Sequence, residues 1–353
     1  MRGVERIWYG SDAGARFMRA LLAPLAAVYR GVAGIRNGLY DAGILRAGVL
    51  SLPAISVGNL TVGGTGKTPI TAWLAHGLRQ RGARPAVLLR GYGGDEELVH
   101  RCLNPDIPVI TSGDRLKGAA LAERSGANVV ILDDAFQHRR VARAHDVVLI
   151  SADERADAPR LLPAGPYREP PSAARRASLV LVTRKSASRI DAERVAADVR
   201  RVAPNVSMAF VHLRLAQLRE VNGSGRRPLS WLEGKDVLAL AAVGHPRAFE
   251  TQITAAVESR TEGDSVRGGK DVEVRFFPDH HAYTDLDVED LVRAAAARIP
   301  VCTLKDAVKL AAIWPRAAPA LWYVSQQIDV ESGGDAIDRL LETIVPALSL
   351  IHI

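Results

Sequence analysis

The chain has 353 residues, with 46 lysines and arginines against 39 aspartates and glutamates, and a formal net charge of +7. This length allows two domains with sizeable cores, and the basic balance suits an acidic partner such as a nucleotide, an anionic lipid or a nucleic acid. The sequence has no basic tract with interleaved aromatic residues, so we expect no nucleic-acid partner. Cys102 and Cys302 stand alone, which argues against a disulfide framework or a metal site and favours a reducing compartment.

The N-terminal residues 1–36 are predicted to form a helical region that associates with a membrane. The apolar run 17–29 contains Arg19 and Pro24, and it is shorter than the roughly 20 apolar residues that a spanning helix needs. Arginines surround the run, as expected of a helix that lies on an anionic membrane surface. An ordinary helix packed on the core is the alternative. No small-residue cleavage site follows the run, so we expect no signal peptide.

A glycine-rich loop follows an apolar run that begins at Ile55, and an amphipathic segment at helical spacing follows the loop. This order predicts a phosphate-binding loop, because glycines let backbone N–H groups turn towards phosphate oxygens. Thr61 stands where the standard spacing has glycine, and a turn that binds nothing is the alternative. We expect Lys67 to reach the terminal phosphates and Thr68 to ligate Mg²⁺. The expected nucleotide-binding residues are Gly63, Gly64, Thr65, Gly66, Lys67 and Thr68.

Two adjacent carboxylates, Asp133 and Asp134, follow the apolar run 129–132. This pattern is typical of a buried parallel strand that carries acidic residues to its C-terminal edge. In P-loop proteins such an acid holds the Mg²⁺ that bridges the phosphates, while a plain strand end is the alternative. Adjacent strand residues point to opposite sides, so the sequence leaves open which of the two carboxylates faces the metal.

Further apolar runs alternate with helical segments, which predicts a doubly wound parallel α/β sheet of the P-loop NTPase type over residues 37–212. An alternating run and the turn signal Asn222-Gly223 predict an antiparallel β linker over 213–236. A second, smaller α/β domain is expected over 237–347. Residues 348–353 match the translation of a transposon-end sequence common in sequencing libraries and are interpreted as an artefact. The predicted strands lie at 85–90, 108–111, 129–132, 146–151, 177–183, 237–243, 272–277, 300–303 and 321–324.

Several motifs follow one another in a characteristic order. They are Val57–Pro69, Arg90–Gly93, Gly94–Glu96, Asp133–His138, Leu161–Pro170, Phe277–His281 and Lys305–Leu310. In this order the chain resembles the tetraacyldisaccharide 4′-kinases, the lipid A kinases of Gram-negative bacteria. The resemblance implies transfer of phosphate from Mg-ATP to the 4′-hydroxyl of tetraacyldisaccharide 1-phosphate, giving lipid IVA at the cytoplasmic face of the inner membrane. It also implies a larger P-loop domain, a smaller α/β domain and a two-stranded linker, and no obligate protein partner.

The same resemblance implies roles for individual residues. Asp95 is expected to be the catalytic carboxylate near the sugar hydroxyl, assisted by Asp279 and His280. A carboxylate that takes a proton helps because a sugar hydroxyl is a poor nucleophile. The expected substrate-binding residues are Arg90, Tyr92, Arg115, Gln137, His138, Arg168 and Glu169. Arginine suits bidentate binding of phosphate, while turn, helix-start and surface ion-pair roles are the alternatives.

Three positions depart from the family pattern. Ala135 replaces a glycine, Leu304 replaces a glutamate, and the segment before Gly94 lacks a loop that the family usually inserts. The short segment leaves a catalytically impaired lipid-binding homologue as one alternative. A P-loop nucleotide-switch ATPase or GTPase is the other. It is disfavoured because Val62 replaces the lysine of the partitioning ATPases, and because the P-loop domain has no Asn-Lys-x-Asp motif.

Overall fold

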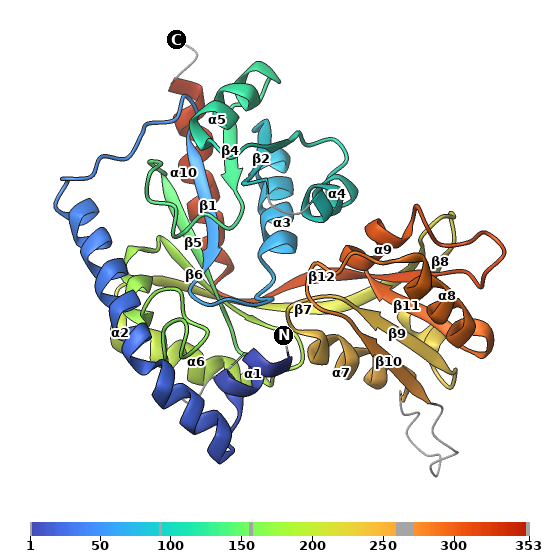
Figure 1. The fold of residues 1–353 in the computed structure, drawn as a ribbon. Coiled ribbons are helices and arrows are strands. Elements are labelled where there is room, and N and C mark those ends of the chain that lie inside the picture. Colours follow the sequence, from blue (N-terminus) through green and yellow to red (C-terminus); the bar gives the residue numbers. More distant parts are fainter. Residues whose placement is uncertain (1, 92–93, 155–157, 259–270, 351–353) are drawn as a thin grey trace. The chain divides into compact units, whose positions relative to one another are not determined.

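The computed structural model describes residues 2–91, 94–154, 158–258 and 271–350, and Figure 1 labels its helices and strands. Contacts between residues divide the chain into two units. Unit 1 comprises residues 1–92, 100–211 and 330–353, and unit 2 comprises residues 93–99 and 212–329. Residues 330–347 therefore group with unit 1, whereas the sequence pattern placed them in the smaller domain.

Short apolar runs form the parallel sheet of unit 1, in the order β6-β5-β1-β4-β2-β3. The strands are β1 (Ala54–Asn59), β2 (Pro85–Leu89), β3 (Val109–Thr111), β4 (Val129–Leu132), β5 (His145–Ser151) and β6 (Leu179–Arg184). Strands β1, β2 and β4 are buried along their whole length, as expected where helices cover both faces of a parallel sheet. The predicted doubly wound α/β fold is confirmed.

Helices pack on this sheet through alternate strand residues. Val130 and Leu132 of β4 pack with Ala119 and Ala122 of α5, and successive strand residues point to opposite faces. The helical elements that follow these strands include α3 (Lys67–Gln80), α5 (Arg115–Arg124), η1 (Pro171–Arg176) and α6 (Arg189–Val202), and much later in the chain α10 (Gly334–Leu350) also belongs to unit 1. Because β1 and β4 are neighbouring parallel strands, the loops that follow them open at the same edge of the sheet.

Two helices precede the sheet, α1 (Arg2–Tyr9) and α2 (Ala13–Asp41). Asp12 caps α2, because its carboxylate accepts a hydrogen bond from the N–H of Ala15 at 3.0 Å. The helix continues through Pro24 for 29 residues, well beyond the run 17–29 considered in the sequence. By length and composition alone it could cross a membrane.

The strands of unit 2 follow one another in the order β10-β9-β11-β12-β7. Strand β9 is parallel to β10 and β11, and β11 is parallel to β12. Strand β7 pairs antiparallel with β8, and Gln217 lies opposite Pro228. The linker over 213–236 stays a prediction. The elements are β7 (Ser207–Glu220), β8 (Arg226–Pro228), η2 (Leu229–Leu232), β9 (Val237–Ala241), α7 (Pro246–Val257), β10 (Val272–Phe276), α8 (Asp285–Ala294), η3 (Ala295–Ala297), β11 (Ile299–Thr303), α9 (Leu304–Leu310) and β12 (Trp322–Ser332).

The Gly-Asp-Glu motif begins a helix, α4 (Gly94–Leu103), that no sequence pattern predicted. Asp95, Glu96 and Glu97 lie in its first turn, where carboxylates interact favourably with the positive end of the helix dipole. The first residues of α4 belong to unit 2 and the rest to unit 1.

Gly58 of β1 packs directly against the fully buried Phe136. A Cβ at Gly58 would lie 2.6 Å from Cβ and 2.8 Å from N of Phe136. We expect Gly58→Ala to lower the free energy of unfolding by about 1–3 kcal/mol, because the strand and the Asp133–His138 segment must separate. Denaturant titration measures this change.

Gly34→Ala is the matched control, because a Cβ added at this position of α2 would meet no heavy atom within 4 Å. We expect it to be neutral or to stabilise by up to about 1 kcal/mol. Equal unfolding midpoints for Gly58→Ala and the wild-type protein would contradict the packing described for β1.

Candidate functional site

The loop after β1 ends at Gly66, which has a φ of 91° and precedes the first residue of α3, Lys67. This φ lies in the left-handed region that favours glycine. No side chain caps α3, so the N–H groups of its first turn point at the space where an anion can bind. Thr68 follows Lys67 in that first turn. The structure thus places a left-handed glycine and an uncapped helix start where the sequence predicts a phosphate-binding loop.

Side chains of neighbouring strands hold this loop. Asn59 donates through Nδ2 to Oγ1 of the buried Thr65 at 3.1 Å, and Thr183 at the end of β6 donates to the carbonyl of Thr65 at 3.1 Å. The ammonium of Lys185 donates to the carbonyl of Gly64. Two of these bonds engage carbonyl groups of the loop and one engages the Thr65 hydroxyl, so the loop is held from the side of β1 and β6.

The carboxylate of Glu154 lies against Gly63, so that a side chain at Gly63 would collide with it. Burial raises the pKa of Glu154 although Lys185 and Lys67 lower it. Burial lowers the pKa of Lys185, against the opposing charges of Glu154 and Asp153.

The two carboxylates after β4 have different environments. Asp133 is buried, accepts a hydrogen bond from Thr71 Oγ1 at 3.0 Å, and lies 3.0 Å from Nε2 of the fully buried His100. Burial raises the pKa of Asp133, but the hydrogen bonds from His100 and Thr71 and the charge of Lys67 outweigh it, so the pKa lies below its usual range. Asp133 is therefore occupied by structural contacts.

Asp134 is 40% exposed and faces cations. Nη1 of Arg168 donates to both its oxygens at 2.9 and 3.0 Å, and Nζ of Lys67 lies 3.8 Å from Oδ1. Its φ of 46° is in the left-handed region, which aspartate tolerates better than most residues. The structure thus brings Lys67, Asp134 and Arg168 together at one edge of the sheet.

Mg²⁺ is usually bound by one or two carboxylates together with substrate phosphates and water. Asp134 fits this requirement, because its carboxylate is accessible beside the phosphate-binding loop, and Thr68 offers a hydroxyl on the same edge. Within the described ranges no group of three histidine, cysteine or acidic residues could hold a metal by itself. Phosphate oxygens of a nucleotide would have to complete such a site.

Glu169 and Gln137, two further residues expected to bind substrate, are held in a polar network with α2. Buried Glu169 accepts hydrogen bonds from Arg176 at 2.8 and 3.1 Å and from Asn37 of α2 at 2.8 Å. Gln137 donates to the carbonyl of Asn59 at 2.8 Å, and its own carbonyl accepts from Arg36 of α2 at 2.6 Å. Glu169 and Gln137 thereby fix α2 beside the loop after β1.

Arg115 points inwards rather than to solvent. It is buried, and it donates to the carbonyls of Leu88 at 2.8 Å and Asp133 at 3.1 Å. Burial lowers its pKa to about 10, although Asp133 raises it. Burial lowers the pKa of His138, and the charge of Arg115 lowers it further. The charge of Arg90 also lowers the pKa of both Arg115 and His138. Tyr92 lies outside the described residues.

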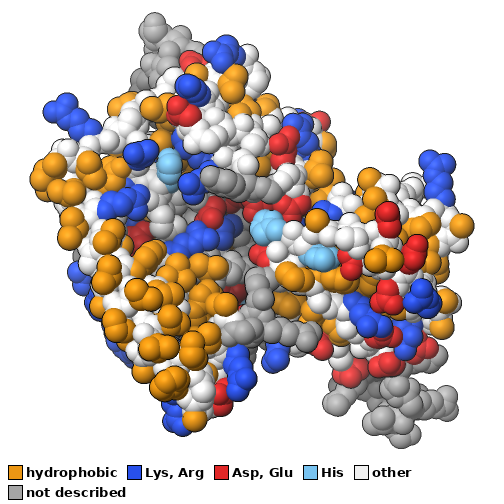
Figure 2. Space-filling model, in the orientation of Figure 1, with side chains coloured by type: hydrophobic (Ala, Val, Ile, Leu, Met, Phe, Trp, Pro, Cys, Tyr) orange, Lys and Arg blue, Asp and Glu red, His pale blue; other side chains and the backbone are white. Residues whose placement is uncertain are grey.

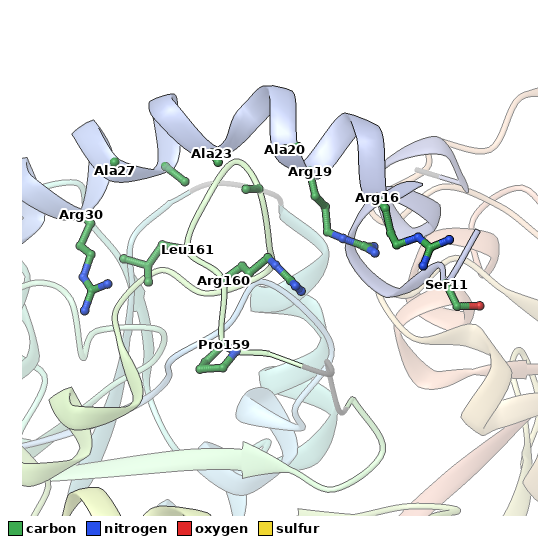
Figure 3. A pocket seen from close by; sticks show the side chains of 12 residues that line it. Ser11, Arg16, Arg19, Ala20, Ala23, Ala27, Arg30, Pro159, Arg160 and Leu161 are labelled. Carbon is green, nitrogen blue, oxygen red and sulfur yellow. The ribbon is translucent and has the colours of Figure 1, made fainter. Parts of the chain in front are cut away.

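A cavity of about 790 Å³ lies in unit 1 between α2 and the loop 159–164 (Figure 3). Figure 3 shows Arg16, Arg19 and Arg30 on the side of α2 that faces the loop carrying Arg160 and Leu161. Alanines of α2 complete its wall. Small apolar side chains and several guanidinium groups therefore line the same space.

The remaining expected residues meet within unit 2. Nδ1 of His280 lies 3.2 Å from Asp95, whose side chain is 7% exposed against 45% for His280. Nζ of Lys305 at the start of α9 donates to Asp279 at 2.9 Å and lies 3.1 Å from Nε2 of His280. His280 has a φ of 59°. Oδ2 of Asp95 is buried and, among the described residues, has no hydrogen-bond partner.

Sequence reasoning missed several residues of these sites. Thr71, His100, Thr183 and Lys185 belong to no motif that pointed to the loop, so only their place in the fold gives them a role. Lys305 did lie in a quoted motif, but no pattern along the chain placed it beside His280.

Comparison with known proteins agrees with this geometry. A family model described as tetraacyldisaccharide-1-P 4′-kinase matches residues 18–345. A tetraacyldisaccharide 4′-kinase of Anaeromyxobacter sp. (strain Fw109-5) is 38% identical, with 97% of this chain and 96% of the relative covered. One of Syntrophus aciditrophicus (strain SB) is 36% identical, with 90% and 91% covered.

A solved structure, LpxK from Aquifex aeolicus in complex with ATP, is similar with a TM-score of 0.69. Its sequence is 27% identical, and the match covers 93% of this chain and 99% of that one. The motif-based resemblance is thereby confirmed by the family model, the relatives and the fold. The chain belongs to the tetraacyldisaccharide 4′-kinase family.

Proposed function

We propose that this protein transfers the γ-phosphoryl group of ATP to the 4′-hydroxyl of tetraacyldisaccharide 1-phosphate, giving lipid IVA in lipid A biosynthesis. The observation that carries the proposal is the meeting of Lys67, Asp134 and Arg168 beside the first turn of α3, which no side chain of the described residues caps. Neither a nucleotide switch nor an impaired homologue is favoured by an observation in the described residues.

Binding of the nucleotide follows from the charges on this edge. Lys67 and the first-turn N–H groups of α3 would hold the terminal phosphates, and Arg168 would add a second cation. Asp134 and Thr68 would hold Mg²⁺, which neutralises phosphate charge when bound. Asp133 would act indirectly, because its hydrogen bonds to Thr71 and His100 fix the strand end from which Asp134 projects.

The Asp95–His280 pair supplies a place for the proton. The 4′-oxygen forms a bond to the γ-phosphorus, the bond from that phosphorus to the bridging oxygen breaks, and its electron pair leaves with ADP. The hydroxyl proton passes to the pair, which is most effective in its unprotonated form. His280 is the more exposed member and would return the proton to solvent.

The cavity beside α2 supports a substrate that is both apolar and anionic. Arg16, Arg30 and Arg160 at its wall could pair with the 1-phosphate, while the alanines of α2 and Leu161 suit an acyl chain. This assignment makes the cavity the substrate-binding surface of unit 1.

The outer face of α2 supports a peripheral membrane location at the cytoplasmic face of the bacterial inner membrane. Figure 2 shows hydrophobic side chains gathered over α2. They recur at helical spacing, with exposed fractions of 59 to 68%, and comprise Phe17, Leu21, Leu25, Val28, Val32 and Ile35. A continuous apolar stripe of this kind suits burial in a lipid surface, while arginines of α2 suit anionic headgroups.

We expect loss of phosphoryl transfer in Lys67→Ala and Asp95→Asn. Each variant should lose at least about 100-fold in kcat/KM, because one lacks the phosphate-binding cation and the other the acidic member of the proton-accepting pair. Transfer of ³²P from [γ-³²P]ATP to micellar tetraacyldisaccharide 1-phosphate measures this.

Lys117→Ala and Asp290→Asn are matched controls, because both residues lie on other helices and face solvent. They should retain wild-type rates. Absence of a 4′-phosphorylated product from the wild-type protein, despite ATP binding, would contradict the proposed function.

We expect Asp134→Asn and Asp133→Asn to have different effects. Asp134→Asn should reduce kcat and raise the Mg²⁺ concentration needed for half-maximal rate, with an unchanged melting temperature, because its carboxylate is accessible. Asp133→Asn should destabilise the fold by about 1–3 kcal/mol, because a buried partner of His100 and Thr71 loses its charge. Steady-state kinetics and thermal unfolding separate the two. A stable Asp133→Asn variant with the stronger Mg²⁺ defect would reverse the assignment.

We expect glutamates at Leu21, Leu25 and Val28 to weaken binding to vesicles that contain phosphatidylglycerol by about 100-fold or more, since each change removes at least about 1 kcal/mol of apolar burial. Sedimentation with vesicles measures the binding. Glutamates at Leu121, Ile190 and Leu286 are the control, because these residues are exposed apolar residues outside α2. Equal loss in both triple variants would refute a specific role of the stripe.

A further inference from the structure

We propose that Lys305 is a positioning residue that holds the Asp95–His280 pair in its unprotonated form. This inference rests on the proposed function for its catalytic meaning, but the arrangement itself is visible within unit 2. Lys305 is the first-turn lysine of α9, and its ammonium reaches Asp279, His280 and Asp95 at 2.9, 3.1 and 3.7 Å.

Lys305 fixes the tautomer of His280. An ammonium group has donors and no acceptor, so Nε2 of His280 must accept the hydrogen bond from Lys305. The single ring proton of neutral His280 is then on Nδ1, from which it donates to Asp95 at 3.2 Å. Lys305, His280 and Asp95 form one chain of donors that ends on a carboxylate.

Lys305 also balances negative charge around the imidazole of His280. The titratable groups that the described structure places against His280 are Asp95 on α4, Asp279 in its own loop and Lys305 on α9. With Lys305 present, one cation balances one of two carboxylates. Without it, two carboxylates would face the imidazole, and a nearby negative charge favours the protonated ring. A protonated ring can no longer accept a proton, and its positive charge makes Asp95 a weaker base for the hydroxyl proton.

Lys305 keeps its place when it releases Nε2 of His280. Lys305 keeps a 2.9 Å bond to Asp279, so its ammonium stays anchored if the imidazole moves to accept or pass on a proton. The backbone of His280, at a φ of 59°, is held next to this anchor by its own N–H, which donates to Asp279 at 3.1 Å. Asp279 therefore positions both the lysine and the histidine.

The test compares Lys305→Met, Lys305→Arg and Lys309→Met in the full-length protein. Lys309 lies one turn further along α9 and donates to the carbonyl of His281 at 3.1 Å, so its loss perturbs the same loop without touching the pair. For Lys305→Met we expect kcat to fall roughly 10- to 100-fold. The acid limb of the pH profile of kcat/KM should move up by about one pH unit. Lys305→Arg should restore most of the profile, and Lys309→Met should leave it in place.

A second readout does not require activity. Nitrogen-15 NMR of histidine-labelled protein, with the His280 signals assigned by their loss in His280→Gln, reports the tautomer and titration of this ring. We expect an Nδ1–H tautomer in the wild type and protonation at higher pH in Lys305→Met. An identical tautomer and titration in the two proteins would overturn the inference. Failure of the wild type to phosphorylate the disaccharide would instead overturn the proposed function, and the NMR result would still decide the role of Lys305.

Discussion

The buried carboxylate of Asp133 is the contact on which the nucleotide edge of unit 1 depends. It joins β4 to α3 through Thr71 and to α4 through His100, and the carbonyl of the same residue accepts from Arg115 of α5. A carboxylate is stable in an apolar interior only when such partners satisfy it, so these three helices are fixed around the end of β4. Asp133 is thereby withdrawn from solvent, and the next residue, Asp134, is left to face the ligand.

Backbone strain marks both of the places where chemistry is proposed. Asp134 and His280 are the non-glycine residues with positive φ in the described part of the chain. This conformation costs about 1–2 kcal/mol per residue, and it persists only where surrounding contacts determine it. Arg168 and Lys67 hold Asp134, while Asp279 and Lys305 hold His280. Two cations compensate for the strained turn at Asp134, and a carboxylate with a cation does so at His280.

Helix α2 shows how one element can serve two environments. Its inner face donates to Glu169 and Gln137, which lie beside the phosphate-binding loop, while an apolar stripe occupies its outer face. A lipid surface that covers the stripe would therefore contact a helix whose inner face is hydrogen-bonded to the segment that carries Arg168.

Local sequence patterns predicted the parallel sheet, the glycine-rich loop between β1 and α3, and Lys67 at its end, while the family resemblance pointed to Asp95 and His280. These features depend on a few adjacent residue types: glycines permit the loop, apolar runs make buried strands, and polar residues follow the strand ends. Only the tertiary structure decided which carboxylate faces the cations, because that depends on His100 and Thr71, distant in sequence from Asp133. Only the tertiary structure also showed that the Gly-Asp-Glu motif begins helix α4, and that Lys305 meets Asp95 across 210 residues of chain. Hydrogen bonds and charges act through space, so a pattern along the chain cannot reveal partners that folding alone brings together.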